Sequence, residues 1–179
     1  KKFINFRKIH FIKMERLILL ILSILIISNV VLAQNTAVQI KEKLYSPLAN
    51  AKVDIANALK KAESEGKHVL IQIGGNWCGW CILLDRKLNS NDTLKSALMN
   101  NFIVYHLNYS SENYNADILA SLGFPQRFGF PVLVVLDSKG NRLHTQNTSY
   151  LEEGKGHHTK KVLAFLNNWS PAALDKHQY

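Results

Sequence analysis

The fold of this chain is decided by the stretch VLIQIGGNWCGWC, residues 69–81. Residues 69–73 form an apolar run typical of a buried strand, residues 74–76 predict a turn, and residues 78–88 have the apolar spacing of a helix. We therefore expect Cys78 at a helix N-terminus. Unpaired backbone N–H groups and the positive end of the helix dipole favour a thiolate over a thiol at that position.

The two cysteines of the chain, Cys78 and Cys81, are separated by two residues. This spacing predicts a redox pair in which Cys78 attacks a disulfide and Cys81, one turn further along, resolves the mixed disulfide. A zinc site would need further ligands at suitable spacing, and c-type haem attachment would need His where Ile82 stands. A static disulfide stays open as an alternative, although so small a loop would stabilise the fold little. We expect no metal and no organic cofactor.

The N-terminal part of the chain has the pattern of a targeting segment. A basic lead over residues 1–13 precedes an apolar run over residues 17–32, and Ala33 precedes Gln34. These features predict a signal peptide over residues 1–33 and export, with the bacterial periplasm as the expected compartment. An uncleaved membrane anchor is the alternative, because the apolar run is marginally long enough to span a bilayer. In an oxidising compartment the cysteines can cycle only if a partner resets them.

The charge of the chain lies largely in that segment. Residues 1–33 hold six of the 22 basic residues and one of the 13 acidic residues, which leaves 16 against 12, or +4. The remaining lysines are scattered and predict a solvated surface, so we expect no nucleic-acid partner. The rest of the chain suits one domain. We expect an N-terminal lead over residues 34–52, the domain over 53–170 and a tail over 171–179.

Strand and helix patterns alternate along this domain. Residue 54 is expected to cap the first helix, and residue 91 or 92 to cap the third. Strands that alternate with helices and end in an antiparallel hairpin and a helix predict a three-layer α/β fold with a central mixed sheet flanked by helices. Helices are expected over 54–65, 78–88, 92–99, 113–122 and 159–169, and strands over 69–73, 102–107, 132–136 and 141–146.

The strand, the Trp-Cys-Gly-Trp-Cys motif and the helix, in this order, resemble the thioredoxin superfamily. The later Gly129-Phe130-Pro131-Val132 is similar to a second hallmark of that superfamily, a cis-proline that opens the strand beside the cysteines. The resemblance extends to exported bacterial thioredoxin-like proteins. It implies a thioredoxin fold, Cys78 as the nucleophile, Cys81 as the resolving thiol, and a substrate groove formed by Trp77, Gly79, Trp80, Phe130 and Pro131.

Two departures from the superfamily pattern affect proton transfer. Gln72 stands where the family has a buried Asp, and His106 stands where it has a Lys. Because Gln cannot act as a general base, deprotonation of Cys81 needs another route, such as water or His106. His157 and His158 are expected to be solvent-exposed at a helix start, without a metal.

The resulting functional prediction is an exported thiol-disulfide oxidoreductase, acting as a reductase or isomerase on protein dithiols and disulfides. A membrane disulfide reductase is the expected resetting partner. The reducing direction is predicted from Gly79 and Trp80, because neither residue carries a positive charge that could stabilise the Cys78 thiolate. A strong oxidant requires such stabilisation. The alternative is a redox-inactive binding module with a thioredoxin fold and a static disulfide.

Overall fold

Residues 43–179 are described by a computed structural model. The predicted signal peptide and its cleavage site after Ala33 lie outside the described residues. None of the helices among residues 43–179 is long and apolar enough to cross a membrane.

The central sheet has four strands in the order β2-β1-β3-β4. β1 pairs in parallel with β2 and antiparallel with β3, and β3 pairs antiparallel with β4. The predicted mixed sheet with a C-terminal hairpin is therefore confirmed. The strands are β1 (His68–Gly74), β2 (Phe102–Asn108), β3 (Val132–Leu136) and β4 (Arg142–Asn147).

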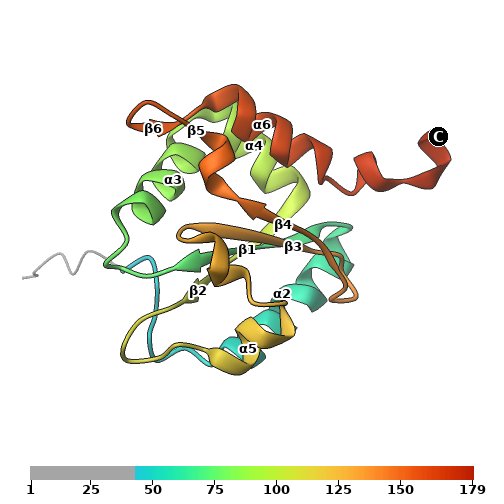
Figure 1. Ribbon diagram of the computed structural model, residues 1–179. Coiled ribbons are helices and arrows are strands. Elements are labelled where there is room, and N and C mark those ends of the chain that lie inside the picture. Colours follow the sequence, from blue (N-terminus) through green and yellow to red (C-terminus); the bar gives the residue numbers. More distant parts are fainter. Residues whose placement is uncertain (1–42) are drawn as a thin grey trace, which may run out of the picture. The chain divides into compact units, whose positions relative to one another are not determined.

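Helices cover both faces of this sheet, as Figure 1 shows with α3, α4 and α6 above it and α2 and α5 below. In β1, Val69, Ile71 and Ile73 join the core on the α2 and α5 side, whereas Leu70 joins the core on the other side. This alternation follows from the period of two along a strand and produces the predicted three layers. The helices are α2 (Ala51–Glu65), α3 (Gly79–Ser90), α4 (Asp92–Asn101), α5 (Ala116–Ser121) and α6 (Thr159–Asn168).

Two of the predicted helix starts are wrong. Asn50, not Asp54, caps α2: its side chain accepts a hydrogen bond from the Val53 N–H at 3.3 Å, so the helix begins one turn earlier. α5 begins at Ala116 instead of residue 113, because Asn115 has a left-handed backbone (φ 51°). Asn91 caps α4 through the Leu94 N–H, as one of the two predicted options.

A small hairpin between β4 and α6 was not predicted. It consists of β5 (Glu152–Glu153) and β6 (Gly156–His157), and β6 contacts α3 (Figure 1). His157 is consequently only 6% exposed, so the expectation that it is solvent-exposed at a helix start is wrong. His158 does stand at the helix start, where its Nδ1 caps α6 by accepting from the Lys161 N–H at 3.4 Å.

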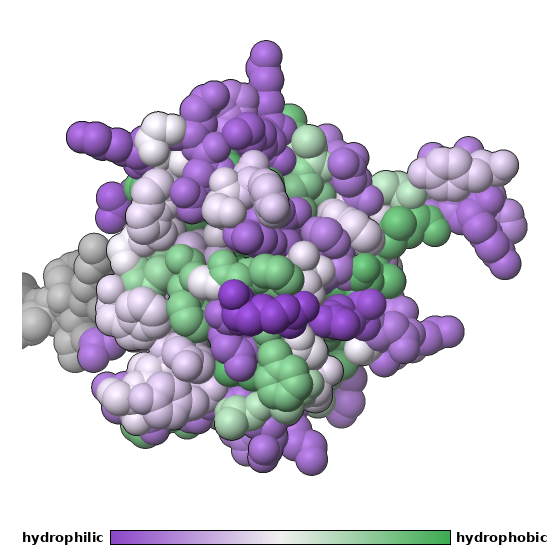
Figure 2. All heavy atoms as spheres, in the orientation of Figure 1, coloured by the Kyte–Doolittle hydropathy of each residue, from purple (hydrophilic) through white to green (hydrophobic). Residues whose placement is uncertain are grey.

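Short 3₁₀ helices complete the fold. They are η1 (Pro125–Phe128), η2 (Thr148–Leu151), η3 (Ala172–Leu174) and η4 (Lys176–Gln178). The side of the protein seen in Figure 2 is largely hydrophilic, with apolar residues gathered near its centre. This distribution fits the solvated surface expected from the scattered lysines.

Candidate active site

The two cysteines form a disulfide at the start of α3, with their Cα atoms 5.3 Å apart. Cys78 is the N-cap of α3, as the sequence predicts, and its Sγ accepts a hydrogen bond from the Cys81 N–H at 3.1 Å. Both cysteines are buried, and Cys81 is completely inaccessible to solvent. A backbone donor thus points at the Cys78 sulfur, and a donor in this position stabilises a thiolate when the pair is reduced.

Two glycines allow the chain to pass close to this pair. A Cβ on Gly74 would collide with the Cys81 Sγ and lie 2.9 Å from the Tyr45 Oη. A Cβ on Gly75 would collide with the Trp77 ring and lie 2.8 Å from the Tyr109 carbonyl oxygen. Residues 74–75 therefore need to lack side chains for the sulfurs and the Trp77 ring to take these positions.

An aromatic rim borders the cysteine pair, formed by Trp77, Phe130, Tyr109 and Tyr114. Trp77 packs edge-on against Phe130 with ring centroids 5.4 Å apart, and its Nε1–H donates to the Tyr109 carbonyl oxygen at 2.7 Å. Tyr109 stacks on Phe130 at 4.8 Å and contacts Tyr114 at 5.2 Å. Trp77 stays 59% exposed, so the rim offers an apolar surface to a partner.

The Phe130–Pro131 peptide bond is cis, which confirms the prediction made from the sequence. Phe130 packs against the buried cluster of Tyr45, Cys78 and Cys81. The Thr148 hydroxyl donates to the Pro131 carbonyl oxygen and holds this loop in place. The loop before β3 and the turn before α3 are therefore brought together around the cysteines.

The two residues between the cysteines have different surroundings. A Cβ on Gly79 would meet no heavy atom within 4 Å, so this position is open. Trp80 is 37% exposed, and its ring contacts the His157 imidazole edge-on at 5.4 Å. The β5–β6 hairpin thus reaches the cysteine motif through one aromatic contact.

A polar network lies beneath Cys81. The buried Gln72 Nε2 donates to the Tyr45 Oη at 2.7 Å and to the Cys81 carbonyl oxygen at 3.1 Å. His106 contacts the Tyr45 ring edge-on at 5.6 Å and pairs with Asp85, Nε2 to Oδ1, at 3.4 Å. Burial raises the pKa of Tyr45 well above its usual value, with a smaller contribution from the Asp85 charge. His106 therefore contacts Tyr45, which in turn packs against the cysteines.

Three residues of this site were missed by sequence reasoning. Tyr45 precedes the predicted domain and is fully buried, Tyr109 supports Trp77, and His157 supports Trp80. Tyr45 and Gln72 are 27 positions apart, and Trp77 and Tyr109 are 32 apart. Such contacts leave no local pattern in the sequence. The one available signal was that Tyr45 is the single aromatic residue of the predicted lead over residues 34–52.

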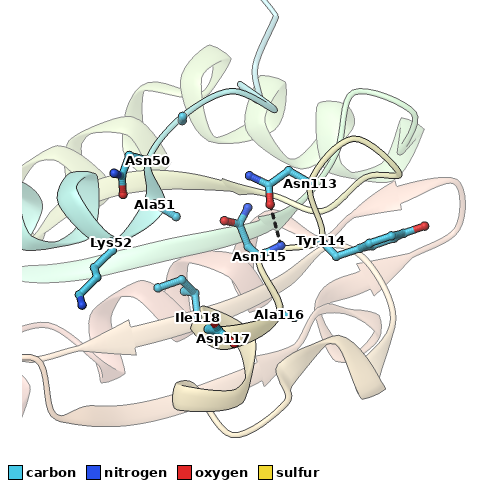
Figure 3. A pocket seen from close by; sticks show the side chains of 10 residues that line it. Asn50, Ala51, Lys52, Asn113, Tyr114, Asn115, Ala116, Asp117 and Ile118 are labelled. Atoms are coloured by element: carbon cyan, nitrogen blue, oxygen red, sulfur yellow. Dashed lines mark hydrogen bonds between the residues drawn. The ribbon is translucent and has the colours of Figure 1, made fainter.

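A separate pocket of about 510 Å³ lies between the start of α2 and residues 113–118 (Figure 3). Two of its polar side chains are engaged within the protein: Asn113 accepts from the Asn115 N–H at 3.0 Å, and the Asn115 side chain donates to the Asn108 carbonyl oxygen at 2.8 Å. Within residues 43–179 there is no group of three or more His, Cys, Asp or Glu side chains that could hold a metal ion. The cysteine pair is therefore the candidate site.

Comparison with known proteins agrees with this geometry. Residues 49–138 match a family model described as thioredoxin-like, and the chain belongs to that family. No curated protein sequence matches the chain significantly.

Three solved structures are similar to this chain, and the first of them has the same fold. A disulphide isomerase from Xylella fastidiosa Temecula1 is 24% identical with a TM-score of 0.62, and the match covers 69% of this chain and 94% of that one. The oxidised C-terminal domain of DsbD from Neisseria meningitidis is 17% identical, with a TM-score of 0.47 and coverage of 68% and 97%. A DsbH oxidoreductase is 20% identical, with a TM-score of 0.47 and coverage of 66% and 81%.

Proposed function

We propose that this chain is an exported thiol-disulfide oxidoreductase that acts on proteins as a reductase or isomerase. The observation that carries the proposal is the position of Cys78, which caps α3 and receives the Cys81 N–H on its sulfur. Membership of the thioredoxin-like family and the structural likeness to a disulphide isomerase support it.

The reaction follows from the two sulfurs. In the reduced protein the Cys78 thiolate attacks one sulfur of a substrate disulfide, forms a mixed disulfide and releases the first substrate thiolate, which takes up a proton. Cys81 then loses its proton, and its sulfur attacks the Cys78 Sγ. This step releases the second substrate thiolate, which is protonated, and closes the Cys78–Cys81 disulfide seen here. Two electrons pass to the substrate, and a partner dithiol must return them.

The surroundings of the pair support a groove for an extended protein segment. Phe130 packs against the cysteine cluster, and Trp77 and Trp80 are both exposed beside it. Exposed aromatic rings supply contact area at low cost in conformational entropy, which suits varied protein substrates. We place Gly79 and Pro131 in the same groove, where Gly79 leaves open space above the helix start.

The direction of the reaction is assigned from the donors that reach Cys78. Within residues 43–179 the donor to its sulfur is the backbone N–H of Cys81, and Gly79 and Trp80 add no charge. If backbone donors alone stabilise the thiolate, we expect a reduction potential nearer the thioredoxin value of about −270 mV than the strong-oxidant value of about −120 mV. We accordingly propose a pair that is kept reduced by a membrane disulfide reductase, with residues 1–33 directing export.

Trapping of mixed disulfides tests the proposal. Cys81→Ser should accumulate covalent complexes with substrate proteins on non-reducing gels, because the attack by Cys78 is retained and its resolution is lost. Cys78→Ser is the matched control and should trap none. If the unsubstituted protein fails to reduce a protein disulfide and neither variant traps a partner, the static-disulfide binding module is the correct description.

A further inference from the structure

Tyr45 is more closely connected to the cysteine pair than its place in the sequence suggests. It lies ahead of the residues that match the family model, 49–138, and yet it is completely buried against Cys78 and Cys81. Its backbone is held by the turn before α3: the Asn76 side chain accepts from the Tyr45 N–H at 3.1 Å and donates to its carbonyl oxygen at 2.7 Å. The position of the Tyr45 ring is therefore fixed relative to the motif.

The hydroxyl of Tyr45 has a proton available for a further partner. Its oxygen accepts the Gln72 Nε2–H at 2.7 Å, and among the hydrogen bonds of residues 43–179 it serves only as an acceptor. A buried hydroxyl normally also donates, because an unmade hydrogen bond in the interior costs free energy. Within residues 43–179, the Tyr45 O–H is thus a donor without an acceptor in the oxidised protein.

The Cys81 sulfur is the nearby group that becomes an acceptor on reduction. Gly74 lies between the two side chains, and a single added Cβ there would touch both the Cys81 Sγ and, at 2.9 Å, the Tyr45 Oη. Gln72 holds both partners, since it donates to the Tyr45 Oη and to the Cys81 carbonyl oxygen. A hydrogen-bond donor of this kind stabilises a thiolate most strongly when the thiolate is buried.

We propose that Tyr45 donates a hydrogen bond to the Cys81 thiolate in the reduced protein and so promotes the step in which Cys81 resolves the mixed disulfide. The inference rests on the proposed exchange function. Tyr45 acts only as a donor and keeps its proton throughout. The Cys81 proton leaves to water, the Cys81 sulfur attacks the Cys78 Sγ, and the bond from Cys78 to the substrate sulfur breaks.

The charges around Tyr45 are consistent with a donor that does not ionise. Asp85 on α3 raises the pKa of Tyr45 further in addition to burial, and His106 on β2 contacts the ring. The hydrogen bond from Gln72 on β1 lowers the pKa of Tyr45, but by less than burial raises it. A phenol in this setting holds its proton at neutral pH, which a donor to a thiolate requires.

The test compares Tyr45→Phe, which removes only the hydroxyl, with Tyr105→Phe. Tyr105 is the matched control because this half-buried tyrosine also packs against the core, and its hydroxyl donates to Asp54 at 3.4 Å, on the α2 side of the sheet. The first readout is the pKa of Cys81 in a Cys78→Ser background. It is measured by titration, with the ultraviolet absorbance of the thiolate as the signal. At pH values below the Cys81 pKa, we expect Tyr45→Phe to lower the fraction of Cys81 thiolate about tenfold. Tyr105→Phe should leave this fraction unchanged.

The second readout is a single turnover of the reduced full chain with glutathione disulfide. In Tyr45→Phe the mixed disulfide should form at the normal rate and then resolve about tenfold more slowly at neutral pH. An unchanged Cys81 pKa together with unchanged resolution would overturn the role of Tyr45 while the exchange function stands. If the unsubstituted protein does not turn over, the exchange function fails, and the pKa measurement still decides whether Tyr45 stabilises the thiolate.

A second variant covers the case in which Tyr45→Phe does not fold. Gln72→Met removes the amide that orients the Tyr45 hydroxyl and keeps a side chain of similar volume. The thiolate fraction of Cys81 should again fall, by a smaller factor than for Tyr45→Phe. No change in this variant would contradict the inference.

Discussion

Gly74 is the residue on which the packing around Cys81 depends most directly. An added Cβ would collide with the Cys81 Sγ, so Gly74→Ala should destabilise the oxidised protein by about 1–3 kcal/mol, the usual cost of overpacking. Gly79→Ala is the control, because its Cβ would meet no neighbour and Ala favours a helix. Urea unfolding of the three proteins measures the difference, and equal loss in both variants would contradict the packing argument.

A substitution at Trp80 tests the proposed direction of the redox reaction. Replacing it with His places a cationic donor between the cysteines, which should stabilise the Cys78 thiolate and raise the reduction potential by tens of millivolts. Trp80→Phe keeps an aromatic ring without that charge and should leave the potential close to the original value. Equilibration with glutathione buffers gives all three potentials. An original value above about −150 mV would reverse the assigned direction.

The residues that could be predicted from the sequence are those whose signals are local. Cys78 and Pro131 lie next to strand and helix patterns, and the structure places Cys78 at a helix start and makes the Phe130–Pro131 bond cis. Tyr45 and His157 could not be predicted in this way. Each meets the motif through tertiary contacts between distant segments, and a single sequence records no trace of such contacts.

At the scale of elements, the strands were predicted more accurately than the helix ends. The short apolar run 132–136 is rich in valine, which favours a buried strand over a helix, and β3 has these bounds. Helix starts depend on which of several polar residues accepts the capping hydrogen bond. Asn50 and Asp54 are both good caps by type, and the backbone geometry before α2 selects Asn50.

The β5–β6 hairpin should make stability depend on pH through His157. Burial, with a smaller contribution from the Lys87 charge, lowers the pKa of His157 below its usual value, and neither ring nitrogen has a hydrogen-bond partner among residues 43–179. In the unfolded chain, His157 binds a proton near pH 6.5. In the folded chain, His157 binds that proton only at a lower pH. Stability therefore falls as the pH falls below about 6.5.

His157→Phe should remove that part of the pH dependence. Phe keeps an aromatic ring against Trp80 and leaves no buried nitrogen without a partner. The loss of stability between about pH 7.5 and about pH 5.5 should be smaller in the variant, as measured by urea unfolding. His144→Phe is the control, since His144 stacks on a different tryptophan, Trp169, at 4.2 Å. An identical change in both variants would mean that the effect is not specific to the hairpin.

For the molecule as a whole, the mixed sheet could be predicted from the order of strand and helix patterns in the sequence, because each of its four strands had a recognisable pattern. The parallel pairing of β1 and β2 and the hairpin of β3 and β4 are the arrangements such an order permits. The start of the folded unit was less accessible to prediction. Residues 43–50 carry no regular element, and the backbone of Tyr45 is attached to the unit by two hydrogen bonds with the Asn76 side chain, one accepted and one donated by Asn76.

The length of chain that folds and functions can be tested by truncation. Cleavage after Ala33 would keep Tyr45, so a protein starting at Gln34 should match the exported material in stability and in exchange activity. A protein starting at residue 49 loses the buried Tyr45 ring and should be less stable by about 3–5 kcal/mol, the typical cost of deleting a large buried aromatic side chain. N-terminal sequencing of periplasmic material and urea unfolding of both truncated proteins check these outcomes. Intact residues 1–33 in a membrane fraction would favour the anchor, and equal stability of the two truncated proteins would contradict a structural role for Tyr45.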